Sequence, residues 1–435
     1  MRNSKICAAV LSLLLCFTAV TAEEPPYSEE NFPEVTSDYV CLYDTANAQL
    51  LYDGRMDEMM YPASITKVMT AVLAIESFDD LEQTILIEPR MWTGLIEANA
   101  SVAGFHPGDQ PTVRDLLYGV LLPSGADAVQ ALAITNDGSV EAFVDHMNAK
   151  AKEIGMANTH FTNATGLHDR DHYSTAADMA LLFEYALSSP LFQEIIASRD
   201  YLTSPLASSP DGLYLESTSW GLINNGEDTY QIPGFLGGKT GFTNPAGRCF
   251  ASHAEFNGMH LILVTGHSEN TGHIADAAKV YNFYEQNYAY RTVAEASQEI
   301  ARIPIEDSFD AEEIVIRMPE TIAFDLPKDA KISVEQNLPE TIHAPLNEGD
   351  PLGKVTVRAN GQLLREFDIT SDISAKHSQL LHFKNQAVAF YNSHKTLCIF
   401  LACLLGVLIL LPLILKLTGR KAKSKKRRKR RRSSH

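Results

Sequence analysis

The sequence has 435 residues, more than one compact core usually holds, so two or three folded units are expected. Apolar residues make up 45% and charged residues 21%, an ordinary globular composition that excludes a collagen, a coiled-coil rod or a wholly disordered chain. The formal net charge of -18 is uneven, because residues 1–22 and 416–435 hold 14 of the 36 basic side chains. The remaining 22 basic side chains face 54 acidic ones. Such an acidic body argues against nucleic-acid binding.

The first 22 residues have the pattern of a secretory signal. Arg2 and Lys5 precede an apolar run from Ile6 to Val20, and the small residues Thr21 and Ala22 follow it. The run is too short to cross a hydrocarbon layer of about 30 Å. We therefore predict an exported protein whose mature chain begins with a flexible lead.

The body that follows alternates between strand and helix patterns. Short apolar runs predict a strand pair at its start, and 3.6-residue periodicity then predicts a helical block whose first helix begins at Ser64. Strands return later, with an Asn257-Gly258 hairpin turn, before a closing helix. The predicted strands are Asp38–Asp44, Gln49–Tyr52, Phe235–Gly241, Arg248–Ala254 and His260–Thr265, and the further helices are Val113–Leu122, Ala126–Ile134, Val140–Ile154, Ala176–Leu187 and His273–Tyr288.

This order of elements predicts an α+β domain whose sheet is completed by both ends of the domain. Alternating short segments after Ile303 predict a small all-β module. The expected organisation is a signal peptide at 1–22, a flexible lead at 23–37, a catalytic domain at 38–295, a small β-rich domain at 302–372, a polar linker at 373–395, a transmembrane helix at 396–415 and a basic tail at 416–435.

The C-terminal segment predicts a membrane anchor. Thr396 to Leu415 is twenty residues without a charge, the length that a helix needs to cross the hydrocarbon layer. The Lys/Arg-rich tail after it favours a cytoplasmic C-terminus, by the positive-inside rule. The acidic body would then lie outside the cell. A nuclear-localisation signal is the alternative interpretation of the tail, which the signal pattern and the apolar segment disfavour.

Cysteine and histidine usage predicts neither a disulfide framework nor a metal centre. Outside the two apolar ends only Cys41 and Cys249 remain, each in a strand-like run, so two buried free thiols are expected. His160, His168 and His172 have a spacing that could suit zinc, but the Asn, Gly and Asp residues around them predict a loop. We expect no cofactor.

Three short motifs carry groups that could perform nucleophilic catalysis. Ser64 and Lys67 lie three apart on one predicted helix, so the amine comes within hydrogen-bond reach of the hydroxyl. A desolvated lysine near a second cation, such as Lys239, can act as the base that activates a serine. Ser124 lies between two predicted helices. The backbone N–H groups of Ser64 and Phe242 are candidates for an oxyanion hole.

These motifs closely resemble those of the D-alanyl-D-alanine carboxypeptidases among the low-molecular-mass penicillin-binding proteins. The resemblance covers about Tyr39 to Asp372. It rests on the segments PASITKVMTA (62–71), LPSGADA (122–128), FTNATGLH (161–168), YSTAADMA (173–180) and GKTGFT (238–243).

The resemblance implies a penicillin-binding-protein fold and removal of the terminal D-alanine from peptidoglycan stem pentapeptides through an acyl-serine. Ser64 would be the nucleophile, Lys67 the base and Ser124 a proton relay to the leaving amine. Lys239 and Thr240 would hold the substrate carboxylate, with Gly241 and Phe242 completing the binding strand. β-Lactams would be covalent inhibitors, and no metal would be needed.

Two positions depart from the family pattern. Ala126 stands where the second motif usually has Asn, and Asp127 points elsewhere on the helix, so it is not assigned the missing amide's role. Gly272-His273 stands where the family commonly has an Arg after Gly. The alternatives are therefore a catalytically weak penicillin-binding or wall-sensing module, and a class A β-lactamase. The second is disfavoured because residues 158–170 contain no glutamate to activate a deacylating water.

Overall fold

The computed structural model describes residues 32–227 and 229–431, in two compact units. Of the described residues, the first unit holds those up to Ala294 together with Ile322–Ile332 and Ala359–Gln362. The second holds Glu295–Thr321, Ser333–Arg358 and the described residues from Leu363 onward. The signal peptide predicted for 1–22 lies outside the described residues, as does most of the predicted lead.

A five-stranded antiparallel sheet forms the centre of the first unit. Its order is β2-β1-β7-β6-β5, so strands from both ends of the unit pair side by side, as predicted. Asn257 and Gly258 have φ of 51° and 79°, the left-handed conformation of the predicted tight turn between β6 and β7. The strands are β1 (Tyr39–Asp44), β2 (Gln49–Gly54), β5 (Phe235–Thr243), β6 (Gly247–Phe256) and β7 (Met259–Ser268).

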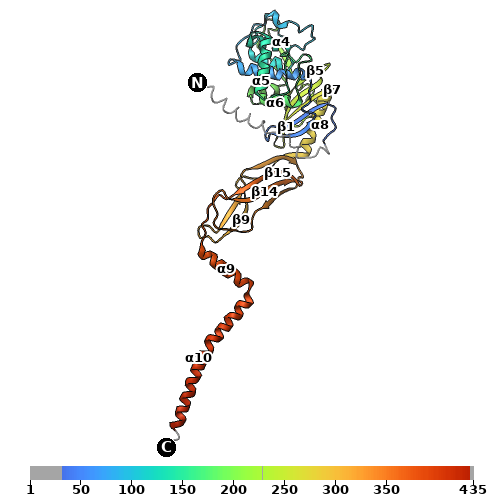
Figure 1. Cartoon of the computed structure of the whole chain (residues 1–435). Helices are drawn as coiled ribbons and strands as arrows, with labels where there is room; N and C mark the ends of the chain where they lie inside the picture. The colour runs from blue at the N-terminus through green and yellow to red at the C-terminus, as the bar shows by residue number, and fades with distance from the viewer. Residues whose placement is uncertain (1–31, 228, 432–435) are drawn as a thin grey trace. The chain divides into compact units, whose positions relative to one another are not determined.

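Both faces of this sheet are buried, which explains why β1 is continuously apolar. Cys41 and Tyr43 belong to one hydrophobic cluster, and Val40 and Leu42 belong to another. This split follows from the two-residue period of a strand. The helical block covers the first face, and α8 (Gly272–Asn287) covers the second (Figure 1).

Two helices of the helical block begin at side-chain caps. The Thr112 and Thr175 hydroxyls accept from the backbone N–H groups of Asp115 and Asp178, three residues further on. Such a cap is worth about 1 kcal/mol. The helix expected from Ser64 starts as a 3₁₀ turn, η2 (Ala63–Thr66), before α2. The α-helices are α2 (Lys67–Ser77), α3 (Val113–Leu121), α4 (Ala126–Asp137), α5 (Val140–Glu153), α6 (Ala176–Leu187) and α7 (Pro190–Ala197).

Several elements were not expected from the sequence. The helix α7 begins after the cap Ser189 with a proline in its first turn, a recognisable start signal. A short pair, β3 (Asp200–Leu202) and β4 (Tyr214–Glu216), follows it. In the same unit β8 (Tyr288–Ala294) pairs antiparallel with β11 (Ile322–Pro327).

The remaining strands form two three-stranded sheets. Their orders are β10-β9-β13 and β12-β14-β15. On β14 alternate residues such as Val355 and Val357 are buried, as the alternating sequence predicts. The bounds are β9 (Glu299–Glu306), β10 (Glu313–Arg317), β12 (Ile332–Asn337), β13 (Ile342–His343), β14 (Pro351–Ala359) and β15 (Gln362–Thr370).

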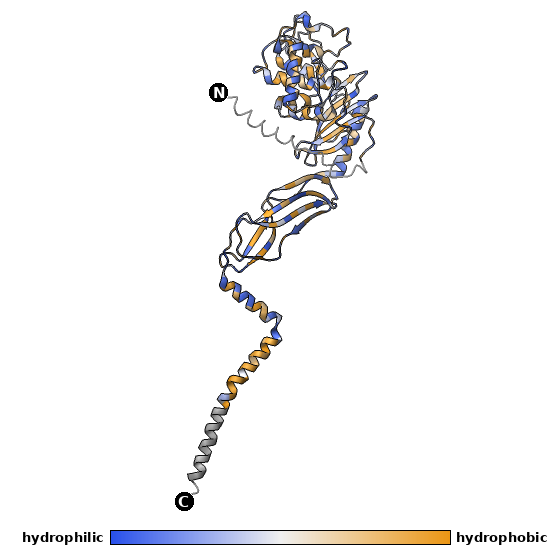
Figure 2. Ribbon diagram, viewed as in Figure 1, coloured by the Kyte–Doolittle hydropathy of each residue, from blue (hydrophilic) through white to orange (hydrophobic). Residues whose placement is uncertain are grey.

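Two helices end the chain, α9 (Gln379–Ser393) and α10 (Lys395–Arg431). The stretch Lys395–Pro412 of α10 has a mean hydropathy of 2.4 and no buried residues, so this helix is long and apolar enough to cross a membrane. Its apolar part is visible in Figure 2. The stretch overlaps the predicted transmembrane segment.

Candidate active site

The turn η2 places Ser64 directly before the buried helix α2. The Lys67 Nζ donates to the Ser64 Oγ over 2.9 Å, so the structure brings the predicted nucleophile and base into contact. Lys67 is only 3% exposed, whereas Ser64 is half-buried. The hydroxyl therefore stays accessible while the amine is shielded from bulk water.

The amine of Lys67 has a second protein partner that the sequence did not reveal. Its Nζ donates to the backbone carbonyl of Thr165 over 2.7 Å. Burial lowers the pKa of Lys67 to about 7, an effect that the charge of Asp127 partly opposes. A substantial fraction of this lysine is thus neutral near pH 7, as a general base requires.

The loop that supplies the Thr165 carbonyl is fixed by Asn163. The Asn163 Oδ1 accepts from the backbone N–H groups of Thr165, Gly166 and Leu167. Gly166 has φ of +80°, and a Cβ at this position would lie 1.9 Å from the Ala63 carbonyl oxygen. Only glycine fits there, which lets the loop lie directly against the serine turn.

Ser124 occupies the connection between α3 and α4. Its φ is +67°, an uncommon conformation for a residue with a side chain. The residue is 6% exposed, and among the described residues its Oγ finds no hydrogen-bond partner. A buried hydroxyl without a partner costs free energy, so it is ready to bond to a substrate group.

The first turn of α4 differs from the family pattern as the sequence indicates. Ala126 is buried and offers no side-chain amide. The Asp127 carboxylate is fully used elsewhere, because it accepts from the backbone N–H groups of three residues of one loop. Those residues are Ala103, Gly104 and Phe105. Asp127 therefore holds this loop beside Ser124 and does not replace the missing amide.

The strand β5 brings the third motif against the serine turn. A Cβ on Gly241 would lie 3.0 Å from the Ser64 backbone nitrogen, so the two backbones are in close contact. Lys239 is fully buried; burial, with the charge of Lys67 adding to it, holds its pKa well below the usual range. Its Nζ donates to the Thr240 carbonyl over 2.8 Å.

The outer part of β5 is open to solvent. Phe242 is 51% exposed, and the Arg248 guanidinium of β6 lies 4.8 Å from its ring centroid. The Thr240 hydroxyl meets that of Thr218 over 2.8 Å. Neither Thr218 nor Arg248 belongs to a motif, so sequence reasoning missed both.

The other departure, His273, lies in the first turn of α8. Its ring packs against Phe250, and its pKa is lowered to about 4, chiefly by burial. Its Nδ1 finds no partner among the described residues. A neutral buried imidazole does not supply the positive charge of the family's arginine. The nearby cation is instead Arg248, whose charge also lowers the pKa of His273.

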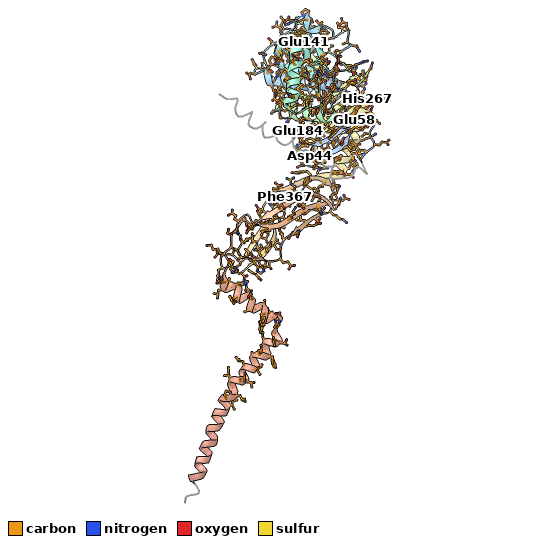
Figure 3. All side chains as sticks on the ribbon, in the orientation of Figure 1. Asp44, Glu58, Glu141, Glu184, His267 and Phe367 are labelled. Carbon is orange, nitrogen blue, oxygen red and sulfur yellow. The ribbon has the colours of Figure 1, made fainter. Side chains whose placement is uncertain are left out.

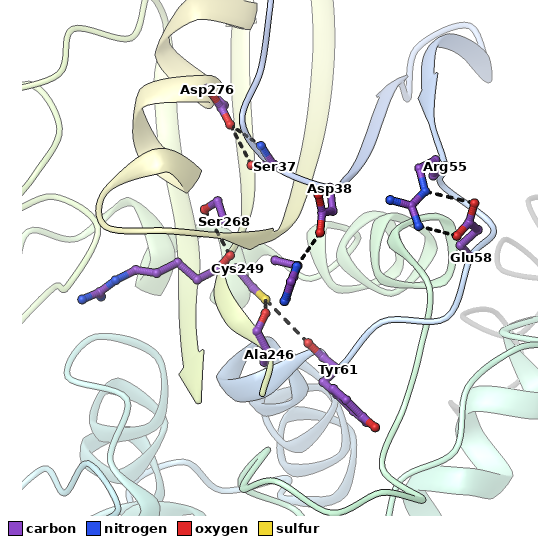
Figure 4. Close-up of polar contacts among 11 residues, drawn as sticks. Ser37, Asp38, Arg55, Glu58, Tyr61, Ala246, Cys249, Ser268 and Asp276 are labelled. Atoms are coloured by element: carbon purple, nitrogen blue, oxygen red, sulfur yellow. Dashed lines mark hydrogen bonds and ion pairs between the residues drawn. The ribbon is translucent and has the colours of Figure 1, made fainter. Parts of the chain in front are cut away.

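Cys249 contacts the segment that leads into Ser64. Its Sγ lies 3.6 Å from the carbonyl oxygens of both Tyr61 and Ala246, and its single hydrogen is available to either of them (Figure 4). Burial raises the pKa of Cys249 to about 11 and that of Cys41 to about 12. Both cysteines are free and buried, as predicted, and the raised pKa values make them unreactive thiols.

The three loop histidines have protein partners. His172 is buried, and both of its ring nitrogens have partners. Its Nε2 lies 2.8 Å from the Thr66 hydroxyl, and its Nδ1 accepts from the backbone N–H of Thr162. The His160 Nδ1 lies 2.6 Å from the carbonyl oxygen of Asp171, and the His168 ring packs edge-on against Tyr61. Their nitrogen atoms do not converge on one point.

The site combines Ser64, in contact with the buried Lys67, and a second buried lysine, Lys239, on an edge strand of the described sheet. This arrangement suits acyl transfer to a serine. Together with the α+β fold, it defines a serine hydrolase of the penicillin-binding type.

Comparisons with known proteins agree with this class. Residues 21–269 match the family model described as D-alanyl-D-alanine carboxypeptidase. The chain is 28% identical over 400 residues to the carboxypeptidase DacF of Bacillus subtilis, covering 90% of this chain and 99% of that protein. It is 27% identical to DacA of Haemophilus influenzae, covering 89% of this chain and 95% of that protein. This chain belongs to the D-alanyl-D-alanine carboxypeptidase family, whose members are serine-type hydrolases.

Solved structures support the same fold. Penicillin-binding protein 5 from Haemophilus influenzae superposes with a TM-score of 0.60 at 25% identity, covering 80% of this chain and 99% of that one. A carboxypeptidase from Francisella tularensis has a TM-score of 0.66 at 22% identity, over 80% of this chain and 95% of that one, and supports the fold alone. The predicted α+β penicillin-binding fold is confirmed.

Proposed function

We propose that this serine-type D-Ala-D-Ala carboxypeptidase removes the terminal D-alanine from peptidoglycan stem pentapeptides through an acyl intermediate on Ser64. The observation that carries the proposal is the 2.9 Å contact between Ser64 Oγ and the buried Lys67 Nζ. Ser64 combines an accessible hydroxyl with a base whose pKa is about 7.

In the acylation step neutral Lys67 takes the Ser64 proton while the Oγ attacks the carbonyl carbon of the penultimate D-alanine. The backbone N–H groups of Ser64 and Phe242 stabilise the oxyanion; the close approach of Gly241 to Ser64 supports this role. Collapse of the intermediate forms the ester bond and breaks the peptide bond. The leaving nitrogen needs one proton, which passes from Lys67 through the Ser124 hydroxyl.

Substrate binding follows from the edge position of β5 in the described sheet. An edge strand leaves backbone groups that an extended peptide can pair with. Lys239 and Thr240 bind the terminal carboxylate, and Gly241 and Phe242 form the wall along the peptide. Arg248, beside Phe242, supplies a further positive charge that compensates for His273.

Deacylation repeats the proton transfers with water in place of the leaving amine. A β-lactam uses the first half of the same route: Ser64 opens the lactam C–N bond, the nitrogen takes the proton, and a covalent penicilloyl-serine remains. β-Lactams are therefore expected to be covalent inhibitors. The intact Ser64–Lys67 pair disfavours a wall-sensing module without catalysis.

The family and α10 together indicate anchoring at a bacterial membrane. We infer a single-pass arrangement with the catalytic unit outside the cytoplasm and the basic tail inside, on the strength of the predicted signal peptide and the Lys/Arg-rich end. Labelling of intact cells by a membrane-impermeant fluorescent penicillin tests this arrangement. Labelling only after lysis would contradict it.

The activity is tested with the full chain in detergent and a pentapeptide ending in D-Ala-D-Ala. Free D-alanine is measured against a Ser64→Ala blank, and intact mass is measured after exposure to penicillin. We expect D-alanine release and a gain of one penicillin in the wild type only. A Ser64→Ala protein that still gains the mass of penicillin would overturn the assignment of the nucleophile.

A further inference from the structure

Three potential metal ligands converge on the hairpin of β6 and β7, outside the groups used for catalysis. His253 and Glu255 lie two residues apart on β6 and so share one face of the sheet. His260 of β7 stands directly opposite Glu255 in the antiparallel register. One nitrogen from each histidine and one carboxylate oxygen lie within 4.8 Å of one another.

The distances suit a small tetrahedral cation. The Glu255 Oε1 lies 3.0 Å from His260 Nδ1 and 3.5 Å from His253 Nε2. Zinc bonds to nitrogen and oxygen at about 2.0 to 2.2 Å, which places neighbouring tetrahedral ligand atoms roughly 3.3 Å apart. These two separations lie on either side of that value, and the third, between the two histidine nitrogens, is within 4.8 Å.

The hairpin holds the ligands in place. His253 is only 8% exposed, so the surrounding sheet fixes the position of its ring. The backbone of His260 is fixed on both sides: its N–H donates to Asp44 Oδ1 over 3.1 Å, and its carbonyl accepts from the N–H of Thr45 over 2.9 Å. Asp44, at the end of β1, is labelled in Figure 3.

An ordinary surface ion pair does not account for the whole arrangement. Glu255 and His260 are each roughly half exposed, and such a pair contributes little to stability. It gives no reason for the buried His253 to direct its Nε2 at the same carboxylate oxygen, 3.5 Å away. A cation bound by His253, Glu255 and His260 together would explain why all three side chains converge on one point.

We propose that this hairpin binds one divalent transition-metal ion of the zinc type through His253 Nε2, the Glu255 carboxylate and His260 Nδ1. The exposed side of Glu255 and His260 leaves the fourth position to water. On β6, His253 lies two residues from Ala251, which pairs with Lys239. The metal thus ties together β6 and β7 next to the catalytic strand and takes no part in the acyl transfer.

The test uses the full chain in detergent, stripped with a chelator and titrated with Zn²⁺ against a chromophoric competitor. We expect one ion per wild-type chain and about a hundredfold weaker binding in His260→Asn and in Glu255→Gln. With Co²⁺ as a spectroscopic probe, the intense visible bands of a tetrahedral site should appear in the wild type and be lost in both variants. Because these two side chains are exposed, neither variant disturbs the core.

His146→Asn is the matched control, since His146 on α5 lies 3.2 Å from a single carboxylate, that of Asp137. It should bind Zn²⁺ like the wild type. Zn²⁺ should also raise the melting temperature of the wild type and of this control but not of His260→Asn, because a ligand stabilises only the fold that binds it. Absence of zinc binding in the wild type, or equal binding in His260→Asn and the control, would overturn the proposal.

Discussion

The two serine-bearing segments of the site, Ala63–Lys67 and Leu122–Ala126, are prepared to different degrees. Ser64 Oγ already accepts from Lys67, whose amine is also held by the Thr165 carbonyl. The backbone around Ser124 is equally fixed, because the Ala126 N–H donates to the Ser101 carbonyl over 2.7 Å. The Ser124 hydroxyl, however, has no partner among the described residues, and Ala126 contributes no amide.

This difference bears on two parts of the proposed acylation. The proposed nucleophile, Ser64, already contacts its proposed base before substrate arrives. In the same proposal, delivery of the proton to the leaving amine depends on the Ser124 hydroxyl, which has no protein partner among the described residues. We therefore expect attack by Ser64 to be robust, and departure of the amine, which completes acylation, to limit turnover.

Removal of the nucleophile is the largest expected effect. Ser64→Ala should abolish penicillin adducts and lower D-alanine release by about ten-thousandfold or more, because the other groups cannot act without it. Ser252→Ala, which removes a buried hydroxyl within the sheet, is the control and should retain activity. Intact mass and D-alanine assays measure both variants.

The two buried lysines should differ in kind. Lys67→Arg should be inactive, since a guanidinium cannot lose a proton in a protein, whereas Lys239→Arg should keep part of its activity because arginine still offers N–H donors to the substrate carboxylate. Lys150→Arg is the control for placing the larger arginine side chain at a buried lysine, because Lys150 is also buried but pairs with Glu76 and Glu153. This variant should keep its activity. Equal acylation by Lys67→Arg and Lys239→Arg would refute this division of roles.

Restoring the family's amide tests the second segment alone. Ala126→Asn should raise the rate of D-alanine release by about twofold to a hundredfold, the worth of one hydrogen bond in the barrier. Acylation by penicillin should change less. Ala126→Leu is the control, because leucine has nearly the shape of asparagine but no amide, and it should not raise the rate of D-alanine release. A faster release by the Leu variant would mean that packing at this position, and not the amide, sets the rate.

The pH dependence of acylation tests the electrostatics of the first segment. As the proposed base, Lys67 would act in its neutral form, so the rate should fall tenfold per pH unit below a midpoint near 7. The charge of Asp127 raises the pKa of Lys67, so Asp127→Asn should move the midpoint to lower pH. A midpoint that stays in place or rises would show that this charge does not act on Lys67.

Local patterns account for what could be predicted from the sequence. The three-residue spacing of Ser64 and Lys67, the caps Thr112 and Thr175 and the Asn257-Gly258 turn depend only on neighbouring residues, and the structure contains each of them.

Contacts between distant segments could not be predicted in this way. Thr165 meets Lys67 across 98 positions, and Thr218 reaches Thr240 from a loop without regular pattern. The carboxylate of Asp127 holds a loop more than twenty residues earlier. Such partners depend on the tertiary arrangement, which periodicity and capping do not encode.

The carboxypeptidase activity is tested most directly by measuring penicillin adducts and D-alanine release on one sample of the full chain, with Ser64→Ala as the blank. We expect one penicillin per chain and D-alanine release well above the blank. A wild type that takes up penicillin yet releases D-alanine no faster than the blank would contradict the carboxypeptidase assignment and favour a wall-sensing module.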